Sequence, residues 1–156
     1  TYTVTVTAVG SGSYSNSLPA SKTVAVSSAA GTDVEFTASD FSGQGTSGTG
    51  SNISANKNGI TLACDKGYGS GTEHVRCYSG GKITITSTDG NISKVEFTFS
   101  GSYTGGLSTT YTYSGTNTSI EYLLSSQARF TKVVVTNLIE HNPEVETPEG
   151  LMKAWL

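Results

Sequence analysis

The chain has 156 residues, which is enough for one ordinary domain, or for one domain that carries pieces of its neighbours. It contains 19 Gly and only 3 Pro, 13% of its residues are charged, and runs of Ser and Thr surround short stretches of Val, Ile, Tyr and Phe, a pattern typical of strands joined by turns and of a secreted surface. The net charge of -3 and the scattered basic residues argue against a nucleic-acid partner, because phosphate binding requires clustered Lys and Arg.

The first predicted element is a hairpin over residues 1–27. Thr and Val alternate from Thr3 to Val9, a Gly/Ser turn follows, and alternation resumes from Thr23 to Val26, which predicts two strands, each with one buried face. A two-stranded hairpin is marginally stable alone, so we expect it to pack on other strands. The chain opens with TYTVTVTAV and no stretch approaches about 18 consecutive apolar residues, so we expect neither a signal peptide nor a membrane span.

The segment YTVTVTAVGSGSYSNSLPASKTVAV resembles the last two strands of a fibronectin type III repeat, in which a Tyr-x-Val-x-Val-x-Ala strand precedes a Gly/Ser turn. A whole repeat needs about 100 residues. The resemblance therefore implies the C-terminal remnant of such a repeat, excised from a longer protein.

The segment 28–137 contains a series of short apolar stretches separated by turn clusters. The predicted strands are DVEFTA, GITLAC, HVRCY, KITITS, ISKVEFTFS, TYTYS, SIEYLL and ARFTKVVVTN. Their number, spacing and turn chemistry predict an all-β domain, an antiparallel β-sandwich.

The clearest alternation lies in KITITS and KVEFTFS, whose apolar residues alternate with Thr, Glu and Ser. We expect five of these residues in the core: Ile83, Ile85, Val95, Phe97 and Phe99. The turn STDGN between the two strands contains Asp89-Gly90, and an Asp-Gly step is a strong hairpin signal. The sequence therefore predicts that these two strands pair with each other.

The last strand, ARFTKVVVTN, changes phase part-way. Ala128 and Phe130 share one parity, whereas Val133 and Val135 share the other. A β-bulge near residues 131–132 would place all four side chains on the same face.

The segment 28–137 as a whole resembles a jelly-roll-like β-sandwich module found near the C-termini of secreted and surface proteins of gut Bacteroidetes. The likeness lies in GITLACDKGYGSGTEHVRCYSGGKITITSTDGNISKVEFTFSGSY and in SSQARFTKVVVTN. It implies a secreted or cell-surface location, neighbouring domains or surface proteins as partners, and no catalytic signature. Relatives of this kind often carry a Trp-x-Gly step before the penultimate strand, and this chain has Tyr113 followed by Ser114-Gly115 instead.

The tail, 138–156, is acidic first and then helix-like. Thr147 can cap a helix, Pro148 suits its first position, and Glu149 favours the positive end of the helix dipole. The tail is consistent with an appended extension, the first turn of a following domain, or a docking segment.

Two cysteines, Cys64 and Cys77, allow one intramolecular pairing. If ITLAC and EHVRCY form a hairpin around the Gly-rich segment 66–72, the two residues lie near each other on adjacent strands, where a disulfide would add roughly 2 to 3 kcal/mol of stability. The alternative is two small buried thiols.

No combination of residues predicts catalysis, since His74 and His141 lie in no hydrolase motif and the chain has no Gly-x-Ser-x-Gly elbow. We expect His74 to be a solvated hairpin residue. Zinc is disfavoured because His74 and Cys77 fall on opposite faces of one strand. A structural calcium ion is possible, although no acidic set forms a recognised loop. The acidic residues available are Asp33, Glu35, Asp40, Asp65, Glu73 and Asp89.

Carbohydrate binding requires exposed aromatic rings beside hydrogen-bonding groups. The candidate ligand-binding residues are five tyrosines in or beside predicted loops: Tyr68, Tyr78, Tyr103, Tyr111 and Tyr113. The alternative is that these rings cap the core with their hydroxyls in water. The sequence thus predicts a non-catalytic accessory module, either a spacer or protein-interaction domain or, as the alternative, a carbohydrate-binding module.

Overall fold

The computed structural model describes residues 2–7, 21–26 and 31–138. The chain divides into two units, of which the smaller contains strands β1 (Tyr2–Thr7) and β2 (Ser21–Val26) and the larger spans Ala30–Glu140. β1 and β2 pair antiparallel, which confirms the predicted pairing of the first two strands. The prediction of a capped helix in the tail lies outside the described residues.

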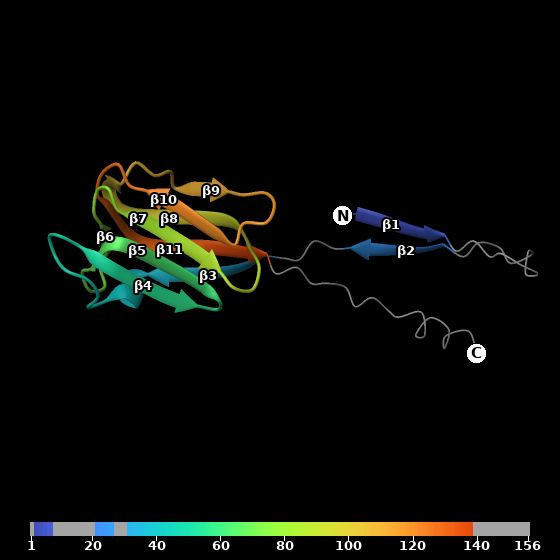
Figure 1. Cartoon of the computed structure of the whole chain (residues 1–156), viewed down its shortest axis with the longest axis horizontal. Helices are drawn as coiled ribbons and strands as arrows, with labels where there is room; N and C mark the ends of the chain where they lie inside the picture. The colour runs from blue at the N-terminus through green and yellow to red at the C-terminus, as the bar shows by residue number, and fades with distance from the viewer. Residues whose placement is uncertain (1, 8–20, 27–30, 139–156) are drawn as a thin grey trace, which may run out of the picture. The chain divides into compact units, whose positions relative to one another are not determined.

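The larger unit is built almost entirely from strands (Figure 1). Its elements are β3 (Thr32–Thr37), a 3-10 helix η1 (Ala38–Phe41), β4 (Ser51–Lys57), β5 (Ile60–Gly69), β6 (Val75–Cys77), β7 (Lys82–Ser87), β8 (Asn91–Thr104), β9 (Thr110–Thr112), β10 (Ser119–Leu123) and β11 (Ala128–Leu138).

These nine strands form one antiparallel sheet in the order β10-β7-β5-β6-β11-β8-β9, with β3 added to β11 and β4 added to β5. The sheet curls until its two halves face each other across the core: Phe97 of β8 contacts Tyr122 of β10, and Ser87 of β7 hydrogen-bonds Asn137 of β11. The all-β antiparallel class is confirmed, whereas the jelly-roll-like sandwich stays a prediction, because the halves belong to one continuous sheet.

β6 joins the two halves of the curl. It pairs with the end of β5 through Gly67–Gly69 and with the start of β11 through Ala128–Phe130. The first part of β5 pairs with β7 instead. The long strands β5 and β11 therefore change partners along their length, which is how a single sheet closes around a core.

The predicted core residues Ile83, Ile85, Val95 and Phe97 are buried, which confirms the alternation in these strands. Phe99 is only half-buried, so that part of the prediction is wrong. Its ring lies parallel to that of Phe97 at a centroid distance of 5.5 Å and packs against the core from its margin.

The predicted bulge in β11 is confirmed. The register with β8 shifts between Phe130 and Lys132, and Phe130 and Val133 are both buried even though their positions differ in parity. The extra residue thus keeps two out-of-phase apolar runs on one face of the strand.

The predicted pairing of KITITS with KVEFTFS is wrong. β7 pairs with β5 and β10, whereas β8 pairs with β11 and β9, so the turn at Asp89-Gly90 crosses between the two halves of the sheet. The segment before β10 hydrogen-bonds the end of β7 and the start of β8. Ser87 N donates to Thr118 O, and Ile92 N donates to Asn117 O. A local turn signal was present, but the pairing was decided by contacts distant in sequence.

Strand β4 was not predicted, although a signal for it was present. Asn58 and Gly59 both have positive φ, 47° and 74°, and Lys57 pairs with Ile60, which is the geometry of a two-residue hairpin. The Asn-Gly step after SNISANK is the strongest short hairpin signal and should have placed β4 before β5.

Candidate functional site

Four of the five candidate tyrosines divide into rings that pack inward and rings that lie beside an arginine, and Tyr78 belongs to neither group. Tyr111 and Tyr113 belong to the first group, since both are half-buried against the core. Tyr111 lies 4.8 Å from the Tyr122 ring and 6.3 Å from the Phe97 ring, and the Tyr113 hydroxyl hydrogen-bonds that of Tyr122 at 2.6 Å. These two rings do share a face, as predicted, but they cap the core.

Tyr78 has a structural contact of its own. Its ring is half-buried, and its hydroxyl accepts a 2.7 Å hydrogen bond from the backbone N–H of Gly48, in the loop before β4. This hydroxyl therefore ties the loop 42–50 to the β6 end of the sheet.

Tyr68 and Tyr103 lie beside arginines. The guanidinium carbon of Arg129 lies 3.8 Å from the centroid of Tyr103, and that of Arg76 lies 6.0 Å from the centroid of Tyr68. Residue Tyr103 is 44% exposed even with Arg129 over one face of its ring. Both contacts have the geometry of cation–π pairs.

Strand register places these four side chains in one row across four adjacent strands. Tyr68 lies opposite Arg76, Arg76 lies opposite Arg129, and Ala128 lies opposite Thr104, which brings Tyr103 beside Arg129. We call Tyr68, Arg76, Arg129 and Tyr103 the Tyr–Arg row.

The Tyr–Arg row lies on the outer face of the sheet. The neighbours of each arginine along its strand are buried: Val75 and Cys77 flank Arg76, and Ala128 and Phe130 flank Arg129. Because side chains alternate between faces, the arginines must point away from the core.

Each arginine is oriented by a side chain two residues earlier on the same chain segment. Arg76 Nε donates to His74 Nε2 at 3.1 Å, and Arg129 Nε donates to Gln127 Oε1 at 2.9 Å. His74 is only 8% exposed, so the expectation of a solvated hairpin residue is wrong. Burial first, and then the positive charges of Arg76 and Arg129, lower the pKa of His74 against the opposing effect of Glu73.

Arg76 and Arg129 are the only arginines in the sequence. Four of the lysines form ion pairs: Lys57 with Asp40, Lys82 with Glu121, Lys94 with Glu96, and Lys132 with Glu35. Within the described ranges, neither arginine has a carboxylate at ion-pairing distance. The row is therefore a local concentration of positive charge on a chain of net negative charge.

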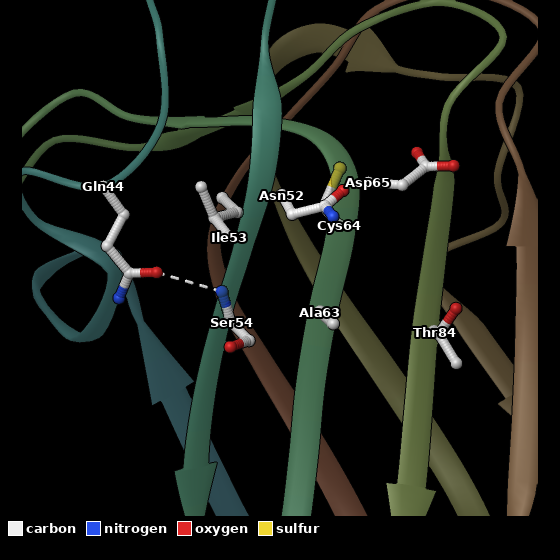
Figure 2. A pocket seen from close by; sticks show the side chains of 8 residues that line it. All are labelled: Gln44, Asn52, Ile53, Ser54, Ala63, Cys64, Asp65 and Thr84. Carbon is white, nitrogen blue, oxygen red and sulfur yellow. Dashed lines mark hydrogen bonds between the residues drawn. The ribbon is translucent and has the colours of Figure 1, made fainter.

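A separate open pocket of about 310 Å³ lies over β4, β5 and β7 (Figure 2). Gln44 Oε1 accepts from the backbone N–H of Ser54 beside it, and Asp65 and Thr84 line it from neighbouring strands. None of its lining residues is aromatic, and the predicted site residues among them are Cys64 and the calcium candidate Asp65. The pocket therefore offers hydrogen bonds but no ring on which a sugar could stack.

The cysteines are free buried thiols in the structure, and the disulfide between them stays a prediction. β5 and β6 form the expected hairpin, but Cys77 lies opposite Gly67, whereas Cys64 lies opposite Ile83 of β7. The two thiols are close nonetheless. A hydrogen bond with the Cys64 thiol is the main cause, and burial the second, of a Cys77 pKa well above its ordinary value.

The acidic residues considered for calcium mostly serve other contacts. Asp40 accepts from Thr37 N and pairs with Lys57, Asp65 accepts from Lys82 N, and Asp33 accepts from Thr136. Over the part of the chain that the structure describes, no three His, Cys, Asp or Glu side chains are grouped as metal ligands.

The same described ranges contain no helix of the length and apolarity needed to cross a membrane. Comparison of the chain with protein-family models, with curated proteins and with solved structures finds no match.

Sequence reasoning missed the two arginines, although a signal for them was present. In VRC and ARF an arginine stands between two residues that bury their side chains. Alternation alone would have placed both guanidiniums on an outer face. Their juxtaposition required the register of β6 on β11, which no local pattern contains.

Proposed function

We propose that this chain is a non-catalytic accessory module of a larger secreted or cell-surface protein, and that it binds carbohydrate through the Tyr–Arg row. The single observation that carries the proposal is the row itself: two tyrosine rings and two guanidiniums aligned across the outer face of four adjacent strands.

The residue types in the row suit sugar recognition. Aromatic rings offer flat apolar surfaces to the C–H faces of sugar rings, and guanidiniums donate several hydrogen bonds in a fixed plane to hydroxyl and carboxylate oxygens. The row crosses three interstrand spacings of about 4.8 Å, or roughly 14 Å. An extended oligosaccharide can contact a row of that length at several rings.

Two tyrosines from the sequence prediction, Tyr68 and Tyr103, belong to this proposed surface. Tyr111, Tyr113 and Tyr78 have no part in it, because their contacts with the core and with the loop 42–50 account for their positions. The proposed ligand surface is thus narrower than the sequence predicted, and it gains two arginines.

The test is a glycan-array screen of the purified chain, its Tyr103→Ala variant and its Leu123→Ala variant. Leu123 is a matched control, since it is a large exposed side chain, 71% accessible, on β10. We expect binding that Tyr103→Ala reduces at least about tenfold, a loss of about 1.4 kcal/mol, and that Leu123→Ala retains. Equal binding by all three proteins, or none, would contradict the proposal.

A spacer or protein-docking role is the second candidate. The inward packing of Tyr111 and Tyr113 favours it, because these rings stabilise the fold and leave that end of the sheet without an aromatic platform. The resemblance of the first strands to a fibronectin type III remnant also supports neighbouring domains. Absence of binding to diverse glycans would favour the spacer or protein-docking role over carbohydrate binding.

A further inference from the structure

The arginines of the Tyr–Arg row face each other on two paired strands. Arg76 and Arg129 are a directly opposed pair on β6 and β11, where Cβ atoms lie about 5 Å apart and like charges destabilise the sheet. The described part of the chain places no carboxylate within 4.0 Å of either guanidinium, although it pairs four lysines. Both of its arginines therefore stand where an anion would stabilise the protein.

The two guanidiniums are also held in position to bind an anion. Each uses Nε for its hydrogen bond, Arg76 to His74 and Arg129 to Gln127, and within the described residues no protein acceptor contacts their terminal amino groups. Tyr103 and Tyr68 flank the pair, with one ring beside each guanidinium. A preorganised guanidinium loses less entropy for each hydrogen bond that it forms with a ligand.

We propose that the Tyr–Arg row recognises an anionic saccharide, and that one carboxylate or sulfate group of the sugar binds between Arg76 and Arg129. This inference rests on the proposed function and specifies its ligand. A carboxylate or sulfate presents several acceptor oxygens, which match the paired donors of a guanidinium. The rings of Tyr68 and Tyr103 then contact sugar residues on either side of the charged group.

A saccharide fits this surface better than a peptide does. At the row, β6 is paired with β5 on one side and β11 on the other, so its backbone groups are already occupied and cannot pair with an added peptide strand. Two arginines on a chain of net charge -3 also fall short of the basic cluster that a nucleic acid requires. An acidic peptide is the competing ligand that the experiment must separate.

Calorimetric titration with matched probes tests the inference. Oligogalacturonate is compared with its fully methyl-esterified form, and dextran sulfate is compared with dextran, so that each pair shares a sugar backbone and differs in its anionic groups. We expect one or both charged probes to bind at least about tenfold more tightly than the neutral match, as one guanidinium–anion contact provides. Arg76→Gln and Arg129→Gln should each abolish that preference.

The control variant is Lys82→Gln, which removes one positive charge from an exposed lysine paired with Glu121 on β7 and β10. It should retain the preference, and thermal melting of all variants checks that they are folded. Loss of the preference in Lys82→Gln as well would mean a response to net charge and would overturn the inference.

The remaining outcomes separate this inference from the proposed function. Equal binding of charged and neutral probes, lost in Tyr103→Ala, would overturn the anionic ligand and leave carbohydrate binding standing. Absence of binding to every saccharide would overturn both. Binding of a poly-glutamate peptide as tight as that of the charged saccharides would overturn the saccharide and favour an acidic protein partner.

Discussion

Apart from Tyr78, the tyrosines whose side chains the structure describes form two groups whose neighbours differ. Around Phe97, the rings of Tyr111 and Tyr122 contact each other and Phe97, and the Tyr113 hydroxyl hydrogen-bonds that of Tyr122. In the Tyr–Arg row, each tyrosine instead contacts a cation at the outer surface. The same residue type thus stabilises the fold in one region and builds a candidate binding surface in the other.

The comparison shows that exposure of a tyrosine is a weaker guide to function than the group beside it. Half-buried rings occur in both regions, since Tyr68 and Tyr111 are each intermediate in exposure. An aromatic neighbour adds packing energy within the protein, whereas a cation without an anion leaves an interaction unsatisfied. Four measurements would test whether the two regions differ as this comparison requires.

The largest expected effect is on Phe97, at the centre of the inward group. Phe97→Ala should lower the free energy of unfolding by about 3–5 kcal/mol, because it removes a buried ring and leaves a cavity. Urea denaturation measures this value. Tyr103→Ala should cost less than about 1 kcal/mol, since only a surface cation–π pair is lost. Comparable losses in the two variants would remove the distinction between the regions.

The hydroxyl pair of the inward group should set the alkaline limit of stability. Burial, and then the hydrogen bond with Tyr113, raise the pKa of Tyr122 above its ordinary value, and burial also raises that of Tyr113. Their stabilisation is full below pH about 10 and is lost as the pH rises further. Tyr122→Phe should cost about 1 kcal/mol at neutral pH and weaken this alkaline loss, as followed by denaturation across pH.

The Tyr–Arg row should produce a smaller loss on the acid side through His74. The folded pKa of His74 lies below its unfolded value of about 6.5, because burial and the neighbouring Arg76 and Arg129 outweigh Glu73. The unfolded chain then takes up the proton first, so stability is full above pH about 6.5 and declines as the pH falls through the folded pKa. His74→Gln should flatten the curve in this range, and an unchanged slope would contradict the proposed cause.

The smallest effect on stability should come from the arginines themselves. Arg76→Gln loses a hydrogen bond to His74 but relieves the repulsion from Arg129, so the free energy of unfolding should change by less than about 1 kcal/mol. Added sulfate should raise the melting temperature of the unmodified chain more than that of this variant. A large destabilisation would show that the pair serves the fold and not a ligand.

Several parts of the fold could be predicted from the sequence because they depend on alternation within one strand. In the strands KITITS and KVEFTFS, the alternating apolar residues as far as Phe97 are buried. In ARFTKVVVTN, the change of phase required the bulge after Phe130. A missed signal, Asn58-Gly59, was of the same local kind. In each case the face of a residue follows from its position in the pleat.

The partners of these strands could not be predicted in this way. Asp89-Gly90 does lie in a bend, but β7 and β8 pair with other strands, because the curl of the sheet directs them to opposite halves. Cys64 and Cys77 likewise meet without being a cross-strand pair, since β5 changes partners between them. Register between distant segments reflects the burial of the whole core, which no short window of sequence contains.

The sequence by itself therefore determined the all-β class, most of the strands and their buried faces, and an outward direction for Arg76 and Arg129. Only the tertiary structure brought those two arginines opposite each other and assigned Tyr103 to their side of the sheet and Tyr111 to the core. The physical reason is that side-chain direction is a local property of a strand, whereas the meeting of two outward side chains depends on which strands pair and in what register.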